Sequence, residues 1–121
     1  HVFRHLMPTC TWNIGTEKKE VFLTFDDGPI PVVTEWVLDV LDKYEAKATF
    51  FCVGENIFKH PAIFEKILLK GHSVGNHTHN HLKGWKTNNQ NYFDNIQKWE
   101  ETVKQLGFKL SNKPLFRPPY G

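Results

Sequence analysis

Short apolar runs alternate along this chain with longer amphipathic stretches, and a break rich in glycine or proline follows each run. The runs cover residues 21–25, 48–53, 72–76 and 113–116. Runs of this length predict strands, and strands that alternate with helices pair in parallel through right-handed crossovers. The sequence therefore predicts an α/β fold in which a parallel sheet is built from successive β/α repeats.

The stretches between these runs carry apolar residues three and four positions apart, which is the spacing of one face of a helix. Helices are predicted from the turn at 29–31 to about Tyr44, from Pro61 to Gly71, and from Tyr92 to Leu106. The first is expected to bury Val33, Trp36, Val37, Val40, Leu41 and Tyr44. The second is expected to bury Ile63, Phe64, Ile67 and Leu68, and the third Tyr92, Ile96, Trp99, Val103 and Leu106.

The length of 121 residues fits one domain with a core of its own. Residues 1–20 are predicted to form a leader segment packed on a domain that spans residues 21–121. The net charge of +2 and the dispersed lysines argue against a nucleic-acid partner. No apolar run is long enough for a transmembrane segment, and the amino end shows no signal-peptide pattern. Cys10 and Cys52 are too few for a metal motif or a disulfide scaffold, and Cys52 is expected in the core.

Two adjacent carboxylates, Asp26 and Asp27, follow the first predicted strand, and Gly28 and Pro29 end that strand directly after them. In parallel sheets the carboxyl ends of the strands meet at one rim, where functional sites are built. Two carboxylates rarely share a pocket unless a metal ion or an arginine separates their roles. A solvated Asp-Asp-Gly turn is the structural alternative.

Three histidines, His77, His79 and His81, follow the third predicted strand. An extended chain would turn all three imidazoles to one side, whereas a helix would bring together only His77 and His81. Two imidazoles and one carboxylate, from Asp26 or Asp27, suit zinc or another first-row divalent ion and leave coordination positions open. A polar loop in which the histidines cap neighbouring groups is the alternative.

Arg117 follows the fourth predicted strand, where a guanidinium needs an anionic partner. It is expected to pair with the aspartate that does not bind the metal, which would keep that carboxylate ionised as a base. Prolines 118 and 119 have no N–H group, so Tyr120 carries the first free backbone donor after Arg117, a candidate contact for an oxyanion. An arginine that caps strand carbonyls is the alternative. Trp85 is expected either to contact a sugar or to pack.

Three motifs, TFDDGP at 24–29, HTHNH at 77–81 and RPPYG at 117–121, together resemble those of the polysaccharide deacetylase family. These NodB-like carbohydrate esterases remove acetyl groups from chitin-type N-acetylglucosamine polymers, peptidoglycan or xylan. The motifs occur in the family's order and cover the chain from about residue 21 to its end. The resemblance implies that the chain is the amino-terminal half of a distorted (β/α) barrel, an incomplete NodB homology domain.

The resemblance also implies a cofactor, one divalent metal ion held by Asp27, His77 and His81. Zinc is the expected ion, with cobalt or another first-row ion as alternatives. A carbohydrate polymer or oligosaccharide is the implied substrate. Because the family's usual substrates lie outside the cytoplasm, the resemblance implies an extracytoplasmic or cell-surface location.

For the catalytic residues, the resemblance implies Asp26 as general base, Arg117 as the residue that orients it, and the Tyr120 N–H as part of the oxyanion hole. His79 receives no role. In the family, later motifs supply a catalytic histidine and an acetate pocket, and this chain stops at Gly121. It is therefore expected to bind metal, to deacetylate poorly or not at all, and to self-associate through uncovered sheet edges.

Two other functions remain open at this point. A different metallohydrolase, such as a phosphoesterase, would need more ligands and a carboxylate that bridges two ions. A non-catalytic carbohydrate-binding or assembly module could retain the same motifs without turnover.

Overall fold

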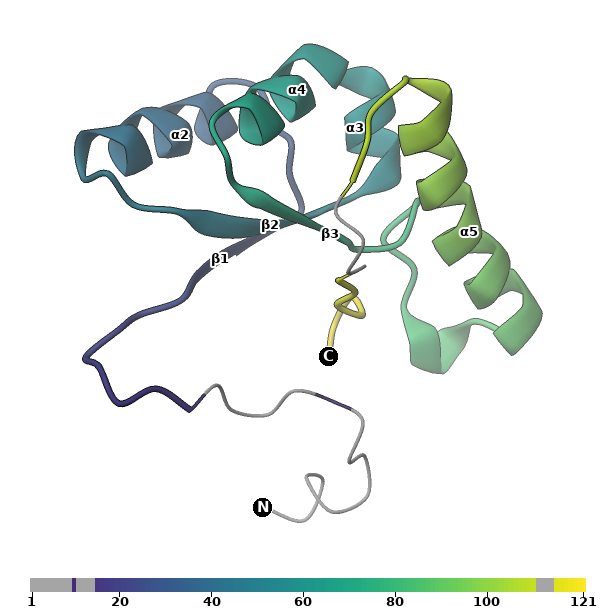
Figure 1. Cartoon of the computed structure of the whole chain (residues 1–121). Helices are drawn as coiled ribbons and strands as arrows, with labels where there is room; N and C mark the ends of the chain where they lie inside the picture. Colours follow the sequence, from purple (N-terminus) through teal and green to yellow (C-terminus); the bar gives the residue numbers. More distant parts are fainter. Residues whose placement is uncertain (1–9, 11–14, 111–114) are drawn as a thin grey trace.

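The computed structural model describes residue 10, residues 15–110 and residues 115–121 (Figure 1). The elements in chain order are β1 (Leu23–Asp26), α2 (Val33–Lys43), β2 (Ala48–Cys52), α3 (Gly54–Lys59), α4 (Pro61–Leu69), β3 (Ser73–Asn76), the 3₁₀ turn η1 (Gly84–Lys86) and α5 (Asn89–Gln105). None of the helices in this described part is long and apolar enough to cross a membrane.

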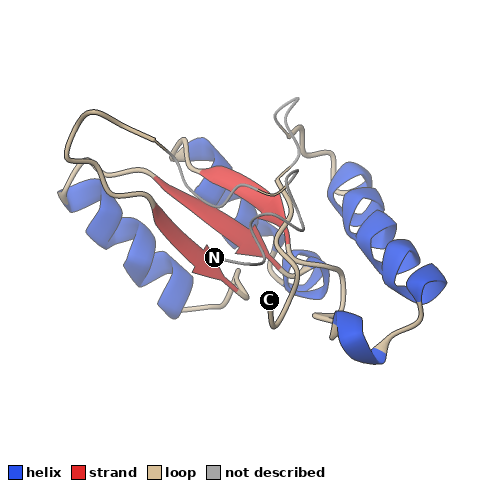
Figure 2. Ribbon diagram, turned by 90° about the horizontal axis from the view of Figure 1, so that it is seen from below, coloured by secondary structure: helices blue, strands red, loops and turns tan. Residues whose placement is uncertain are grey.

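The three strands form one parallel sheet in the order β1-β2-β3, which Figure 2 shows as three adjacent arrows. Phe25 lies opposite Phe50, and Phe50 lies opposite Val74. The predicted α/β fold with parallel strands is thus confirmed. Because the strands run in parallel and in register, their carboxyl ends at Asp26, Cys52 and Asn76 lie at one rim of the sheet.

The predicted fourth strand at 113–116 falls partly outside the described residues, which resume at Leu115. In the described part it is reduced to a single parallel bridge between Phe116 and Asn76. The Asn76 N–H donates to the Leu115 carbonyl at 2.7 Å, and the Arg117 N–H donates to the Asn76 carbonyl at 3.0 Å. The two prolines that follow have no N–H with which to extend the pairing. This bridge delivers Arg117 to the same rim.

Figure 1 shows α2 and α4 over one face of the sheet, with α5 beside α3 at the end nearest β3. The core between these elements consists of Leu38, Leu41, Ala48, Phe50, Cys52, Ile57, Phe64, Ile67, Trp99 and Val103. The Trp99 indole N–H donates to the Cys52 carbonyl at 2.7 Å, which ties α5 to β2 inside this core. Cys52 is fully buried, as predicted, and burial raises the pKa of its thiol.

The buried face predicted for the first helix is wrong in part. Val33 and Trp36 in α2 and Tyr44 directly after it are exposed, and the buried residues of the helix are Thr34, Leu38 and Leu41. The helix is rotated because Thr34 tolerates burial, since its hydroxyl accepts a hydrogen bond from the Ile30 N–H at 2.8 Å.

The other predicted helices are confirmed with small changes of boundary. Trp99 and Val103 of α5 are buried as expected. This helix begins at Asn89, earlier than predicted, because the Asn88 side chain caps it by accepting from the Asn91 N–H at 2.9 Å. The six-residue helix α3, which precedes α4, was not predicted. Of the predicted leader, residues 1–9 and 11–14 lie outside the described residues, and residues 15–20 are exposed.

Candidate functional site: a carboxylate and histidine cluster at the sheet rim

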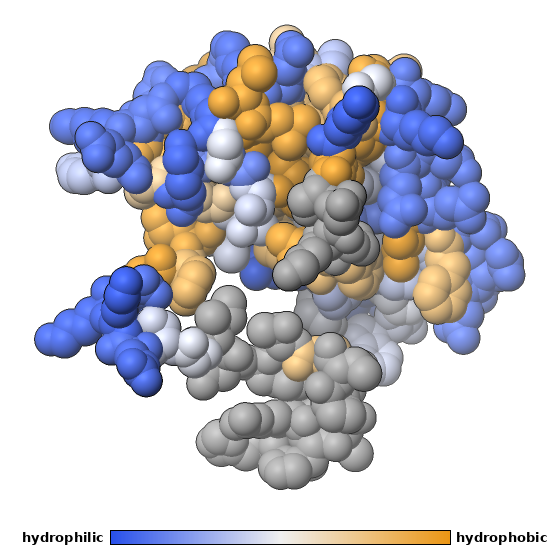
Figure 3. Space-filling model, viewed as in Figure 1, coloured by the Kyte–Doolittle hydropathy of each residue, from blue (hydrophilic) through white to orange (hydrophobic). Residues whose placement is uncertain are grey.

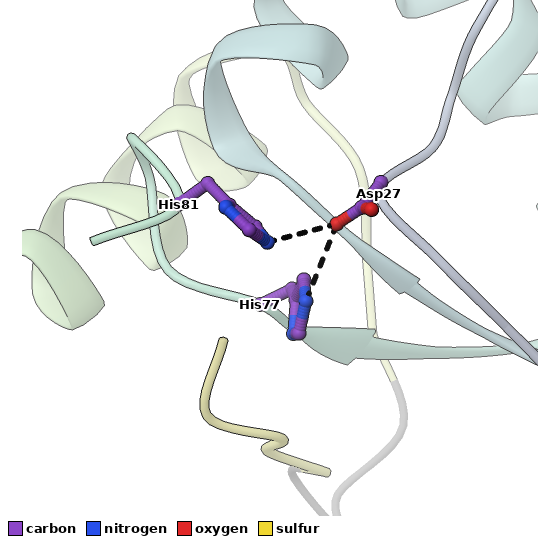
Figure 4. A group of neighbouring side chains, drawn as sticks. All are labelled: Asp27, His77 and His81. Carbon is purple, nitrogen blue, oxygen red and sulfur yellow. Dashed lines mark ion pairs between the residues drawn. The ribbon is translucent and has the colours of Figure 1, made fainter. Parts of the chain in front are cut away.

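Asp27 meets two histidines just beyond the carboxyl ends of the strands (Figure 4). Its Oδ1 lies 3.0 Å from His81 Nε2 and 3.4 Å from His77 Nε2. One ligand atom from each residue lies within 4.8 Å of the other two. The sequence left open which aspartate joins the histidines, and the structure brings Asp27 to them. His77 is 3% exposed whereas Asp27 is exposed, so the cluster opens to solvent on the side of the carboxylate.

The tautomer of His77 follows from its second ring nitrogen. His77 Nδ1 lies 2.7 Å from the Arg117 backbone carbonyl, which only accepts hydrogen bonds. Nδ1 therefore carries a proton, and Nε2, which faces Asp27, is the nitrogen that could bind a metal ion. A histidine whose other nitrogen donates to a carbonyl is the usual arrangement around a bound metal ion. Two imidazoles and one carboxylate therefore fit zinc or another first-row divalent ion, with positions left for water or substrate.

The loop that carries the histidines is shaped by an asparagine at the end of β3. The Asn76 side chain donates to the Ile96 carbonyl at 3.0 Å and accepts from the Thr78 N–H at 2.8 Å. The His77 N–H donates to the Cys52 carbonyl at 3.1 Å, which fixes the first ligand against β2. Thr78 and His81 both have positive φ angles, 60° and 54°. The loop is thus neither the extended chain nor the helix that the sequence suggested.

His79 lies outside the cluster. It is 7% exposed, and its Nδ1 lies 3.2 Å from the Thr102 hydroxyl. That hydroxyl donates to the Lys98 carbonyl, so the His79 ring donates to Thr102. Burial lowers the pKa of His79, and the nearby Lys98 lowers it further, while Glu55 acts in the opposite sense. His79 is therefore a buried, neutral histidine that anchors the loop to α5.

Asp26 is held by Arg117 rather than by the histidines. Arg117 Nη1 donates to Asp26 Oδ1 at 2.6 Å and to the Thr24 hydroxyl at 3.0 Å. The guanidinium carbon lies 4.0 Å from the centre of the Phe51 ring. The carboxylate of Asp26 thus has a fixed direction and a cationic partner.

Thr24 and Phe51 were not identified as site residues from the sequence. The period of two in strands was the available signal, because Thr24 and Asp26 are two positions apart and share a face of β1. Phe51 is the register partner of Asp26 on β2, a relation that appears only once the strands are paired.

Tyr120 lies beside the cluster. Its ring centre is 4.9 Å from that of His81, and Lys83 Nζ lies 5.1 Å from the Tyr120 ring centre. Among the described residues, no backbone carbonyl accepts from the Tyr120 N–H. Trp85 is 87% exposed, so the expectation that it packs is wrong, and its contact with a sugar stays a prediction.

The comparison with protein families matches residues 13–121 to polysaccharide deacetylase. A peptidoglycan-N-acetylglucosamine deacetylase of Bacillus cereus is 38% identical over an alignment of 121 positions that covers 98% of this chain and 55% of that protein. The solved Bc1960 peptidoglycan N-acetylglucosamine deacetylase superposes with a TM-score of 0.78 at 43% identity, over 86% of this chain and 48% of that one. For the peptidoglycan deacetylase PdaC from Bacillus subtilis the TM-score is 0.79 at 33% identity, over 89% and 52%.

This chain therefore spans about half the length of the relatives that it matches. The match includes the rim residues 26, 27, 77, 81, 117 and 120, and it extends over nearly all of the described sheet and helices. The chain belongs to the polysaccharide deacetylase family.

Proposed function

We propose that this site removes acetyl groups from an N-acetylglucosamine-type polymer of the cell wall in a reaction that depends on one divalent metal ion. The observation that carries the proposal is that the two neighbouring aspartates have different partners. Asp27 lies 3.0 Å from His81 Nε2, while Asp26 is bonded to Arg117 at 2.6 Å. The relatives named peptidoglycan N-acetylglucosamine deacetylases supply the substrate class.

A divalent ion held by Asp27, His77 and His81 would lower the pKa of a bound water and polarise the acetyl carbonyl. Asp26 accepts the proton from the attacking water, and the Arg117 guanidinium fixes the direction of this carboxylate. The Tyr120 N–H donates to the oxygen on which negative charge develops. As the C–N bond breaks and acetate leaves, the proton taken up by Asp26 passes to the leaving sugar nitrogen. These assignments are supported by the bond between Arg117 and Asp26 at the rim and by the Tyr120 ring centre, which lies 4.9 Å from that of His81.

The cluster supports one ion rather than two. Within the described ranges, Asp27, His77 and His81 are the one group of three close metal-ligating side chains. The adjacent carboxylate of Asp26 is paired with Arg117 through Oδ1, which argues against its use as a bridge between two ions. This arrangement disfavours a phosphoesterase-type site with two metal ions.

Zinc is the proposed ion because two imidazoles and a carboxylate are among its usual catalytic ligands, with cobalt as a substitute of similar preference. We propose an extracytoplasmic or cell-surface location, since the relatives act, by name, on peptidoglycan.

Acetate release tests the proposal. The 121-residue chain is incubated with peptidoglycan and with an acetylated chito-oligosaccharide, with and without chelator, and after return of Zn²⁺. We expect slow release that the chelator abolishes and Zn²⁺ restores, and that is lost in Asp27→Asn. Glycan binding without release on either substrate would instead indicate a non-catalytic module, and two metal ions per chain would indicate another metallohydrolase.

A further inference from the structure

The backbone of Asp27 has an unusual conformation. Its φ angle is 69°, in the left-handed region that residues other than glycine rarely adopt. Such a conformation is strained and persists only where surrounding contacts hold it. Since the carboxylate of Asp27 points toward His77 and His81 from this backbone, whatever holds the backbone also sets the direction of the carboxylate.

A side chain on α3 makes the contact that this conformation needs. Asn56 Nδ2 donates to the Asp27 carbonyl at 2.7 Å. The Val53 N–H, at the start of the same helix, donates to the next carbonyl, that of Gly28, at 2.9 Å. Two successive carbonyls of the strained turn are therefore bonded to α3, one through backbone and one through a side chain.

The same end of α3 also holds the histidine loop. The N–H groups of Gly54 and Glu55 donate to the carbonyls of Thr78 and His79 at 3.0 and 2.9 Å. Gly54 permits this approach, since a Cβ there would lie 2.5 Å from His79 Nδ1. The first residues of α3 thus connect both segments that carry the cluster, the turn with Asp27 and the loop between the two histidines.

We propose that Asn56 is a positioning residue of the Asp27–His77–His81 centre. Its amide keeps the Asp27 turn in the left-handed conformation, so that Oδ1 stays within 3.0 and 3.4 Å of the two Nε2 atoms. This role rests on the proposed metal-binding function of the same cluster. Ligand groups must be held to within about half an ångström of the required geometry, and partners behind the ligands provide that precision.

A purely structural role is the competing explanation, in which Asn56 only stabilises the junction between β1 and α3. The two roles differ in what happens to metal affinity. Loss of a merely structural contact lowers the free energy of unfolding and leaves the affinity of the folded protein unchanged. Loss of a positioning contact weakens metal binding in the protein that remains folded.

The experiment titrates the metal-free 121-residue chain with Co²⁺ and follows its visible absorption bands, whose intensity and position report the ligand geometry. For Asn56→Ala we expect Co²⁺ affinity to fall by about 10-fold, the usual effect of removing a partner behind a metal ligand. Asn56→Gln keeps an amide donor and is expected to recover part of that loss. The readout does not depend on catalytic turnover.

Asn88→Ala is the matched control. It also removes one bond of 2.9 Å between an asparagine side chain and a backbone group, at the cap of α5, where it does not contact the cluster. We expect it to lower stability and to leave Co²⁺ affinity unchanged. Co²⁺ affinity and spectra of Asn56→Ala equal to those of the wild type would overturn the role of Asn56. If Asn56→Ala does not fold, the same comparison is made with Asn56→Gln. Failure of the wild-type chain to bind Co²⁺ would overturn the metal centre itself and, with it, this role.

Discussion

The imidazole ring of His77 is hydrogen-bonded to the backbone carbonyl of Arg117. The Arg117 carbonyl accepts from His77 Nδ1 at 2.7 Å, while the Arg117 side chain bonds Asp26 at 2.6 Å. One residue therefore fixes the tautomer of a proposed metal ligand and the direction of the proposed base. The two functions are chemically separable, because a substitution changes the side chain and leaves the carbonyl in place.

The first prediction uses this separation. Arg117→Lys keeps the positive charge but loses the planar guanidinium that bonds Asp26 and Thr24 and lies on Phe51. We expect acetate release to fall by about 100-fold, the lower range for loss of an oriented general base. Co²⁺ affinity should stay near the wild-type value because the carbonyl that bonds His77 remains. A parallel loss of affinity and turnover would show that the two functions are not separate.

The second prediction concerns the histidine motif. His81→Ala removes a proposed ligand and should weaken Co²⁺ binding by more than about 100-fold, beyond the usual effect of a residue behind the ligands. His79→Asn is the control within the same loop, because His79 bonds Thr102 and lies outside the cluster. It should lower the thermal midpoint and leave Co²⁺ affinity unchanged. Equal losses of affinity in both variants would contradict the ligand set.

The order of strands and helices, and the meeting of the three motifs at one rim, were predictable because both depend on local patterns and on parallel pairing. The shape of the histidine loop was not, since the loop with the positive φ angles of Thr78 and His81 is held by a local bond from Thr78 to Asn76 and by long-range bonds to Asn95 and α3. The exposure of Trp36 escaped prediction for a related reason. Which face of an amphipathic helix meets the sheet depends on the capping bonds of its polar residues.

A third prediction concerns self-association through uncovered surfaces. In the described part of the chain, β1 pairs only with β2. Phe22, directly before β1, and Trp36, on the following helix α2, are exposed. Figure 3 shows apolar side chains at the surface among hydrophilic ones. Unpaired strand edges and apolar surface favour association, so we expect the sedimentation coefficient to rise with concentration and Trp36→Glu to reduce the rise. Trp85→Glu, at a second exposed tryptophan of the described residues, is the control. A monomer at every concentration would contradict this prediction.

The last prediction concerns the pH dependence of folding. His72 is buried directly before β3, and its Nε2 has no described hydrogen-bond partner. Burial lowers the pKa of His72 from the ordinary 6.5. The charges of Lys47 and Lys70 lower this pKa further, while Asp42 acts in the opposite sense. Below pH 6.5 the unfolded chain therefore binds more protons at this position, so stability falls as pH falls, by at most about 1.4 kcal/mol per pH unit from one group. His72→Asn retains an acceptor for the Ala48 N–H and should flatten the decline between pH 7.5 and 5. Urea unfolding in the presence of chelator measures the free energy of unfolding at each pH. Parallel plots of this free energy against pH for wild type and His72→Asn would refute the assignment of the decline to His72.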